Sequence, residues 1–249
     1  MLFPSSSGRR ELLRAFLAGL LCAVGNASAI AGDGVDALLA EIERDMAHLG
    51  PALGVDGLSP AVRRAIREVP RHAFVPADQR AHAYRNRPLP IGYGQTISQP
   101  LIVAAMTELL QLEPGQRVFE LGTGSGYQAA VLAALGAEVY SVEIVPPLAE
   151  RARAALDATG YGAAVRTRTG DGYYGWEEAA PFDAVIVTAA GDHVPPPLLE
   201  QLKPGGRMVL PIGGRYFTQQ LVLVTRRADG SIETRELIDV SFVAMAGRK

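Results

Sequence analysis

The chain has 249 residues, of which 48% are hydrophobic, so it is long enough for one α/β domain with a substantial core. Its formal net charge of −2 at pH 7 lacks the basic excess that is typical of nucleic-acid-binding proteins, and we expect no nucleic-acid partner. The sequence contains no internal repeats or low-complexity tracts.

The first 29 residues have the pattern of a secretory signal peptide. Arginines precede an apolar stretch at 15–24, and the small residues of a cleavage site follow at 27–29. Two of the arginines, Arg9 and Arg10, are adjacent and loosely resemble a twin-arginine signal. We therefore expect residues 1–29 to be a signal-peptide-like segment, with a mature chain that starts at Ile30. A mis-set start codon and a membrane-tethered N-terminal helix are the alternatives.

The scarcity of cysteine and histidine argues against disulfide, cysteine-nucleophile and metal sites. Removal of the signal-like segment would also remove Cys22, the single cysteine, and with it any disulfide or cysteine nucleophile. The four histidines show no metal-ligand spacing, so we expect no metal. We also expect no stable membrane association once the segment is removed.

Two helices are predicted ahead of the core. Apolar residues recur at helical spacing over 35–49, and Gly50 and Pro51 are expected to end that helix. Ser59 and Pro60 have the form of an N-cap and a first helical residue for a second helix over 61–69. These helices form an N-terminal helical cap. The small and polar residues 92–96 then predict a mobile loop ahead of a third, apolar helix over 101–110.

The stretch 117–135 predicts a buried strand, a glycine-rich turn and a helix, which is the first unit of a doubly wound α/β fold. Ligands of such folds bind where the turn meets the helix. The glycines at 122, 124 and 126 differ from the dinucleotide fingerprint, because Tyr127 occupies the place of its third glycine. That difference disfavours a nicotinamide oxidoreductase.

The next strand, over 138–143, ends in an acid. Glu143 lies about twenty residues after Gly122, where α/β nucleotide sites place the carboxylate for ribose hydroxyls. The alternative is an ordinary exposed glutamate at a strand end.

The remaining pattern completes the sheet. A helix over 148–156, strands over 165–169, 183–187 and 207–211, a turn at 203–206, and a strand pair over 220–225 and 232–240 are predicted. We therefore expect an α/β fold: a Rossmann-like, doubly wound, mostly parallel seven-stranded sheet with an N-terminal helical cap and an antiparallel C-terminal strand pair.

Several motifs together resemble one enzyme family. They are Val69–Pro76, Leu89–Pro100, Met106–Leu110, Glu120–Gln128, Gly170-Asp171-Gly172, Pro181-Phe182-Asp183, Val187–Ala190 and Gln201–Gly206. This set is similar to the protein-L-isoaspartate O-methyltransferases, which are class I S-adenosylmethionine-dependent methyltransferases. The resemblance covers about residues 35–246, and Gln95–Pro100 is its most specific part. Two departures bear on peptide-context preference: His72 replaces a glutamate, and Ala244 stands where the family usually has proline.

The resemblance implies an activity and a domain plan. The activity is protein repair, in which S-adenosyl-L-methionine donates a methyl group to the α-carboxyl of L-isoaspartyl residues in damaged proteins and peptides. The plan is a single methyltransferase domain over 30–249, with the cap and active-site loop in 30–100 and the Rossmann-like core in 101–249.

The resemblance also implies site residues. The expected cofactor-binding residues are Thr96, Ile97, Glu120, Gly122, Thr123, Gly124, Gly126, Glu143, Gly170, Asp171 and Gly172. The expected substrate-binding residues are Gln95, Ser98, Thr188 and Ala189, with Ser98 as the catalytic position beside the substrate carboxylate. Asp171 would accept from the adenine amino group, or else only form a tight turn. Ser98 would otherwise be the N-cap of the third helix, with Pro100 at its first position.

Other functions and locations stay open at this point. A small-molecule carboxyl or O-methyltransferase of class I fold is the alternative enzyme, and a non-catalytic module with an inactive cofactor pocket is the alternative from another class. We expect a monomer. The family resemblance implies the cytoplasm, whereas residues 1–29 favour the periplasm.

Overall fold

The computed structural model describes residues 34–214 and 218–247. The signal-like segment 1–29 therefore lies outside the described residues. Residues 34–53 are helical, which extends past the predicted end at Gly50 and Pro51. Pro51 lies in the last turn, and the helix ends where Gly54, at φ +71°, and Val55 both donate to the Gly50 carbonyl, at 2.7 and 3.0 Å.

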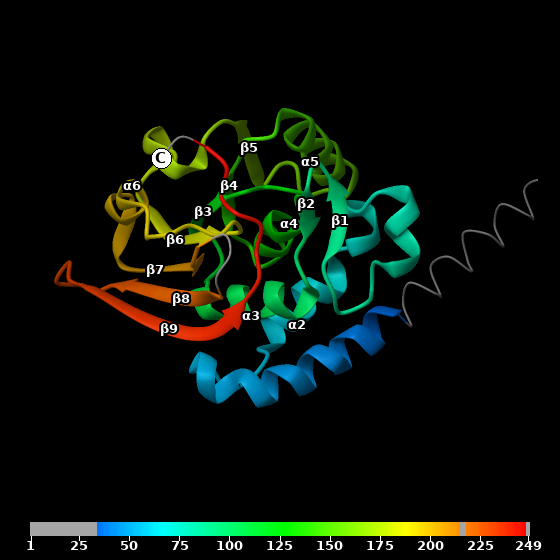
Figure 1. The fold of residues 1–249 in the computed structure, drawn as a ribbon, viewed down its shortest axis with the longest axis horizontal. Helices are drawn as coiled ribbons and strands as arrows, with labels where there is room; N and C mark the ends of the chain where they lie inside the picture. Colours follow the sequence, from blue (N-terminus) through cyan, green and yellow to red (C-terminus); the bar gives the residue numbers. More distant parts are fainter. Residues whose placement is uncertain (1–33, 215–217, 248–249) are drawn as a thin grey trace, which may run out of the picture.

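Seven strands form the central sheet (Figure 1). They are β3 (Arg117–Leu121), β4 (Glu138–Glu143), β5 (Val165–Thr169), β6 (Phe182–Val187), β7 (Leu202–Ile212), β8 (Gln219–Arg226) and β9 (Ile232–Val240). Their order is β5-β4-β3-β6-β7-β8-β9, with parallel pairing from β5 to β7 and antiparallel pairing from β7 to β9. The predicted mostly parallel sheet with an antiparallel C-terminal pair is confirmed.

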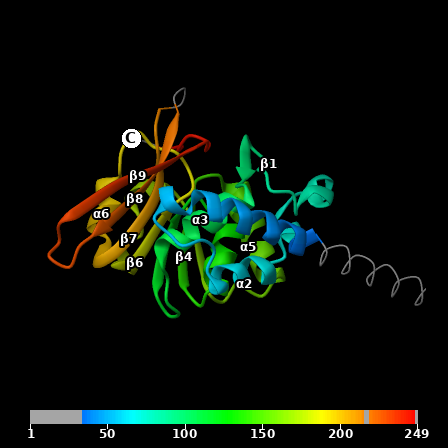
Figure 2. The same cartoon turned by 90° about the horizontal axis from the view of Figure 1, so that it is seen from below.

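The helices lie in two layers around the sheet (Figure 2). They are α2 (Pro60–Glu68), α3 (Pro100–Leu110), α4 (Tyr127–Ala134), α5 (Pro146–Ala158) and α6 (Pro196–Glu200), with short 3₁₀ turns η1 (Arg71–Phe74), η2 (Ala77–His82), η3 (Gly172–Tyr174) and η4 (Glu177–Ala179). The helix 34–53 and α2 to α5 share one apolar core with one face of the sheet, while α6 and η4 share a second core with the other face.

Alternation along the strands explains the two cores. In β3, Val118 belongs to the core under α4, whereas Phe119 and Leu121 belong to the opposite core. The Phe119 and Phe182 rings lie 5.4 Å apart between β3 and β6. Successive side chains of a strand point to opposite faces, so a sheet covered on both sides buries the side chains of both orientations.

Two predicted connections differ from the structure. The segment predicted as a loop over 92–96 belongs to a hairpin of β1 (Leu89–Gly92) and β2 (Gln95–Ile97). The residues predicted as a turn over 203–206 lie within β7, where the register opposite Phe182 and Ala184 is irregular and Gly205 has φ +83°. In both places glycines adopt a positive φ within hydrogen-bonded strands. In the sequence alone, such glycines are typical of a turn or loop that ends a strand.

Candidate active site

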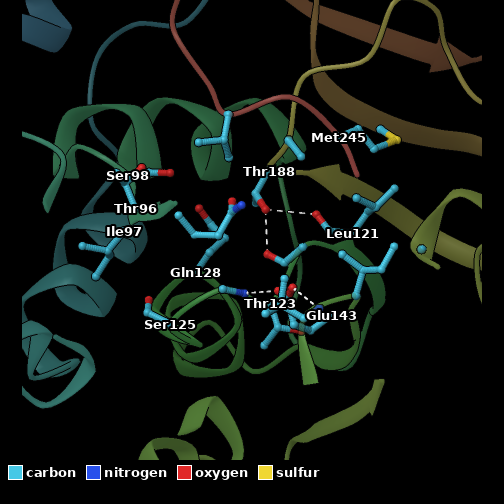
Figure 3. Close-up of a pocket in the computed structure, with 18 of the residues that line it drawn as sticks. Thr96, Ile97, Ser98, Leu121, Thr123, Ser125, Gln128, Glu143, Thr188 and Met245 are labelled. Atoms are coloured by element: carbon cyan, nitrogen blue, oxygen red, sulfur yellow. Dashed lines mark hydrogen bonds between the residues drawn. The ribbon is translucent and has the colours of Figure 1, made fainter. Parts of the chain in front are cut away.

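A pocket lies at the carboxyl ends of the parallel strands (Figure 3). It encloses about 790 Å³ of free space, with the solvent at its mouth included. The walls come from β2, the turn after β3, the end of β4, the end of β6 and the C-terminal segment 243–246. The predicted site residues that line it are Gln95, Thr96, Ile97, Ser98, Gly122, Thr123, Gly124, Glu143, Gly172, Thr188 and Ala189.

The glycine turn is held by Thr188 at the end of β6. The Thr188 hydroxyl donates to the carbonyl oxygens of Leu121 and Gly122, at 3.0 and 2.6 Å, as Figure 3 shows. Gly122 has φ +93°, and a Cβ on it would lie 2.5 Å from the Thr188 hydroxyl oxygen. The turn therefore requires glycine at 122 for both conformation and space. Because its hydroxyl proton is directed at the turn, Thr188 contributes to the site chiefly by fixing the turn that lines the pocket.

Glu143 is fixed where β4 meets the pocket. Its side chain is 5% exposed, so the alternative of an ordinary exposed glutamate is wrong. One carboxylate oxygen accepts from the Gly124 amide at 2.7 Å, and the other accepts from the Val145 amide at 2.9 Å. A carboxylate has about four acceptor positions, so lone pairs remain for hydroxyl groups in the pocket.

Glu120 does not line the pocket. It is fully buried, its carboxyl group accepts from the Ser141 hydroxyl, and Ser141 also shares a 2.5 Å hydrogen bond with Thr123. Burial raises the pKa of Glu120 to about 8, although the Ser141 hydrogen bond lowers it, and the nearby Glu143 raises it further. This shift favours the protonated, neutral form of Glu120 in the fold. Glu120 lies beneath the glycine turn and supports Thr123 from below.

Three other predicted residues lie outside the pocket. Asp171 accepts from the Tyr173 amide at 3.0 Å as the N-cap of η3, and it lines a smaller adjoining hollow together with Gly247. Gly126 begins α4 at φ +88°, and a Cβ on it would contact Ala152 of α5 at 3.4 Å. Gly170 precedes Asp171 and lines neither cavity.

Ser98 is not the N-cap of α3. That position belongs to Gln99, which makes no side-chain capping bond. The Leu101 amide instead donates to the side-chain oxygen of Asn86, a residue distant in the sequence, at 3.0 Å. Since Asn86 satisfies the helix end, the alternative role of Ser98 as a helix cap is wrong, and its half-buried side chain faces the pocket.

The C-terminal segment closes the pocket and was only partly anticipated from the sequence. The Ala190 amide donates to the Val243 carbonyl at 2.9 Å, and the Met245 amide donates to the Ala190 carbonyl at 2.8 Å. The Gln219 side chain holds Phe242 by two hydrogen bonds. The Phe242 backbone amide donates to Gln219 Oε1 at 2.6 Å, and Gln219 Nε2 donates to the Phe242 carbonyl at 3.0 Å. The substitution at Ala244 thus lies on the pocket wall, whereas His72 pairs with the Tyr84 hydroxyl at 2.7 Å and does not line this pocket.

Other lining residues were not predicted as site residues. They are Val103, Leu121, Ser125, Tyr127, Gln128, Val142, Ile144 and Val145. Ser125, Tyr127 and Gln128 belong to the Glu120–Gln128 motif, and Val142, Ile144 and Val145 flank Glu143 in the sequence. Val103 lies in the apolar helix α3, where the sequence alone does not distinguish it from a core residue.

The donor set fits S-adenosylmethionine. Gly122 leaves the backbone open to a close ligand, and Glu143 offers a buried carboxylate suited to hydroxyl groups. The residues that the structure describes contain no cluster of three side chains able to hold a metal ion.

Sheet order, glycine turn and strand-end acid together define a class I methyltransferase fold. Residues 51–249 match the family described as protein-L-isoaspartate(D-aspartate) O-methyltransferase, and the chain belongs to that family.

Relatives and solved structures agree with this assignment. A protein-L-isoaspartate O-methyltransferase 2 of Syntrophobacter fumaroxidans is 52% identical over 96% of this chain and 98% of its own length. A protein-L-isoaspartate O-methyltransferase 1 of Nitrosospira multiformis is 58% identical over 78% of this chain and 84% of its own. One solved protein-L-isoaspartate O-methyltransferase covers 86% of this chain and 66% of its own, at 29% identity and TM-score 0.75. A Plasmodium falciparum structure described with the same activity, in complex with S-adenosyl-L-homocysteine, covers 84% of this chain and 97% of its own, at 25% identity and TM-score 0.70.

Proposed function

We propose that the pocket beside Ser98 and Glu143 is where this chain transfers a methyl group to the α-carboxyl of L-isoaspartyl residues. By family, the chain is an S-adenosylmethionine-dependent protein-L-isoaspartate O-methyltransferase, which repairs damaged proteins and peptides. One observation carries the assignment of the site. Ser98 lies on the wall shared by the cofactor pocket and a second, adjoining groove.

The adjoining groove is the proposed acceptor site. It encloses about 890 Å³ of free space, open solvent included, and it shares Thr96, Ser98 and Thr188 with the cofactor pocket. Its far wall is the end of β9 with the following residues 241–242, and Val243 lines both cavities. A groove that opens to solvent beside Ser98 can admit a peptide chain, which supports the repair activity over a small-molecule carboxyl methyltransferase.

The chemistry asks little of the side chains beyond position. The acceptor carboxyl has a pKa near 4 and is ionised at neutral pH, so the site needs no general base. S-adenosylmethionine, when bound, supplies the electrophilic methyl group. The Ser98 hydroxyl makes no hydrogen bond to the described part of the chain, and we assign it to the acceptor carboxylate. Holding the carboxylate in line and excluding water then lower the barrier.

The cofactor roles follow the same geometry. Gly122, Thr123 and Gly124 would lie against the donor, and Glu143 would accept from the ribose hydroxyls. Asp171 remains the proposed partner of the adenine amino group, because its hollow adjoins the pocket and shares Met245 and Ala246 with it. The methyl ester product would cyclise to a succinimide as a backbone nitrogen displaces methanol, and hydrolysis of the ring returns some normal aspartate.

A paired-substrate assay tests this function. The full chain is incubated with labelled S-adenosylmethionine and either an isoaspartyl peptide or the same sequence with normal aspartate. We expect base-labile methyl ester on the first peptide alone. Ester on small carboxylic acids, with none on the isoaspartyl peptide, would favour the small-molecule alternative. Calorimetric titration with S-adenosylhomocysteine and with NAD separates both from an oxidoreductase and from an inactive pocket.

We further propose that residues 30–249 form one domain that acts as a monomer. One apolar core runs from Val35 in the cap to Leu223 in β8, which supports a single domain. The large exposed hydrophobic side chains among the described residues, Tyr93, Tyr174 and Ile232, lie on separate elements. Light scattering of the purified protein should therefore give the mass of one chain.

Two observations favour different cellular locations for this protein. Family membership favours the cytoplasm, where the methyl donor is made, and the pattern of residues 1–29 favours export. Within the described ranges no helix is long and apolar enough to cross a membrane. Cell fractionation with sequencing of the mature N-terminus decides: periplasmic protein that starts at Ile30 supports export, and intact cytosolic protein that starts at Met1 contradicts it.

A further inference from the structure

Arg71 in η1 is a buried cation next to the active site. Its side chain has no exposed surface, and among the described residues it is the only fully buried positively charged side chain. No acidic side chain in the described part of the chain forms an ion pair with it. Burial of a charge without an opposite charge is strongly unfavourable, so a fold that keeps such a residue offsets that cost elsewhere or uses the charge.

The contacts of Arg71 connect it to the proposed acceptor position. Its Nη2 atom donates to the Ser98 carbonyl at 2.7 Å, and its Nε atom donates to the Ala83 carbonyl at 2.9 Å. The guanidinium carbon lies 4.8 Å from the centre of the Tyr127 ring, and Tyr127 lines the cofactor pocket. Arg71 therefore contacts two residues of the pocket wall from behind, without lining the pocket itself.

A purely structural role does not account for the charge. Two carbonyl acceptors could be satisfied by a neutral donor, and they do not neutralise a guanidinium. The Nη1 atom is buried and has no hydrogen-bond partner among the described residues. Burial lowers the pKa of Arg71 to about 10, while Tyr127 partly opposes this effect, so the group is still charged at neutral pH.

We propose that Arg71 is a positioning residue for the acceptor: it fixes the Ser98 backbone, and its uncompensated charge favours an ionised carboxylate at the Ser98 hydroxyl. This inference rests on the proposed acceptor site at Ser98. The attraction acts on the acceptor before reaction, because the carboxylate loses its negative charge as the ester forms. The contribution of Arg71 therefore appears in the KM for the isoaspartyl peptide more than in kcat.

Two substitutions separate charge from shape. Arg71→Met keeps much of the length of the side chain without its charge, and Arg71→Lys keeps the charge without the fork of donors. For the full chain, we expect Arg71→Met to raise the KM for an isoaspartyl peptide at least tenfold and Arg71→Lys to recover part of that loss. The dissociation constant for S-adenosylhomocysteine, measured by calorimetry, should stay within about twofold of wild type in both variants.

A charge-specific readout distinguishes this role from simple loss of structure. Wild-type enzyme should bind the isoaspartyl peptide more tightly than its α-carboxamide analogue, which inhibits competitively, and Arg71→Met should lose this preference. An unchanged preference overturns the proposal, as does a parallel weakening of S-adenosylhomocysteine and peptide. Failure of both variants to fold also overturns it, because Arg71 would then be a structural residue. If wild type methylates no isoaspartyl peptide, the proposed function fails first, independently of Arg71.

Discussion

The Glu143 carboxylate accepts a hydrogen bond from the Gly124 amide at 2.7 Å, and this bond joins the end of β4 to the turn after β3. The two features that the sequence places nineteen residues apart are thus one unit in space. The acid fixes the glycine turn and at the same time presents its remaining lone pairs to the pocket. Cofactor binding and the shape of the turn should therefore change together when Glu143 is altered.

Replacement of Glu143 by alanine should weaken binding of S-adenosylhomocysteine by about 1.5–3 kcal/mol, the usual effect of losing a charged hydrogen-bond partner. Isothermal titration calorimetry measures it. Glu138→Gln is the matched control, because Glu138 begins the same strand but is exposed and lines no pocket. Equal affinity for the Glu143→Ala variant and wild type would contradict the ribose assignment.

Gly122→Ala should weaken S-adenosylhomocysteine binding at least tenfold and lower the melting temperature. The added Cβ would lie 2.5 Å from the Thr188 hydroxyl oxygen, at a backbone φ of +93° that alanine disfavours. Gly170→Ala is the control, since its Cβ would meet only Val142 Cγ1 at 4.0 Å and no positive φ is required there. If Gly122→Ala and Gly170→Ala showed similar affinities and melting temperatures, the turn would not require glycine at position 122.

Glu120→Gln should flatten the pH dependence of stability. The pKa of Glu120 in the fold is about 8 and its ordinary value is 4.5, so the native state keeps a proton that the unfolded chain releases between these values. Its contribution to stability is therefore complete below pH 4.5 and is lost as the pH rises through 8. Melting temperatures from about pH 5 to pH 8 should fall less steeply for Glu120→Gln than for wild type or Glu138→Gln. Parallel curves would show that Glu120 is already ionised in the fold.

Local pattern was sufficient for the parts of the site that lie on regular elements. The strand over 117–121, the glycines after it and the strand ending at Glu143 all occur where the sequence predicts them. Each is set by short-range physics, since buried strands need apolar runs and close turns need glycine. The resemblance then supplied Ser98, which no periodicity would have selected.

Long-range contacts decided what the sequence could not. Glu120 was expected to bind the cofactor, but its depth depends on Ser141 in a neighbouring strand. Ser98 had two possible roles, and the choice depends on Asn86 reaching the start of α3 across the fold. Arg71 lies within the motif Val69–Pro76, but the sequence does not indicate its burial, which depends on contacts with Ala83 and Tyr127. Such long-range contacts produce no periodic pattern or fixed spacing in the sequence from which they could be predicted.

The roles of Ser98 and Asn86 can be separated by experiment. Asn86 supplies the acceptor for the Leu101 amide at the start of α3, and Ser98 does not. Ser98→Ala should therefore leave the melting temperature close to wild type. If its hydroxyl holds the acceptor carboxylate, kcat/KM for an isoaspartyl peptide should fall roughly ten- to hundredfold, about 1.4–2.7 kcal/mol.

Asn86→Ala should show the opposite pattern. The loss of a helix cap lowers the free energy of unfolding by about 1 kcal/mol, while methylation by the folded fraction stays near normal. Thermal melting and single-turnover methylation of both variants, with S-adenosylhomocysteine titrations as a check on the cofactor pocket, complete the comparison. Near-normal methylation by Ser98→Ala would remove Ser98 from the active site. A loss of stability in that variant equal to the loss in Asn86→Ala would mean that Ser98 supports the start of α3 after all.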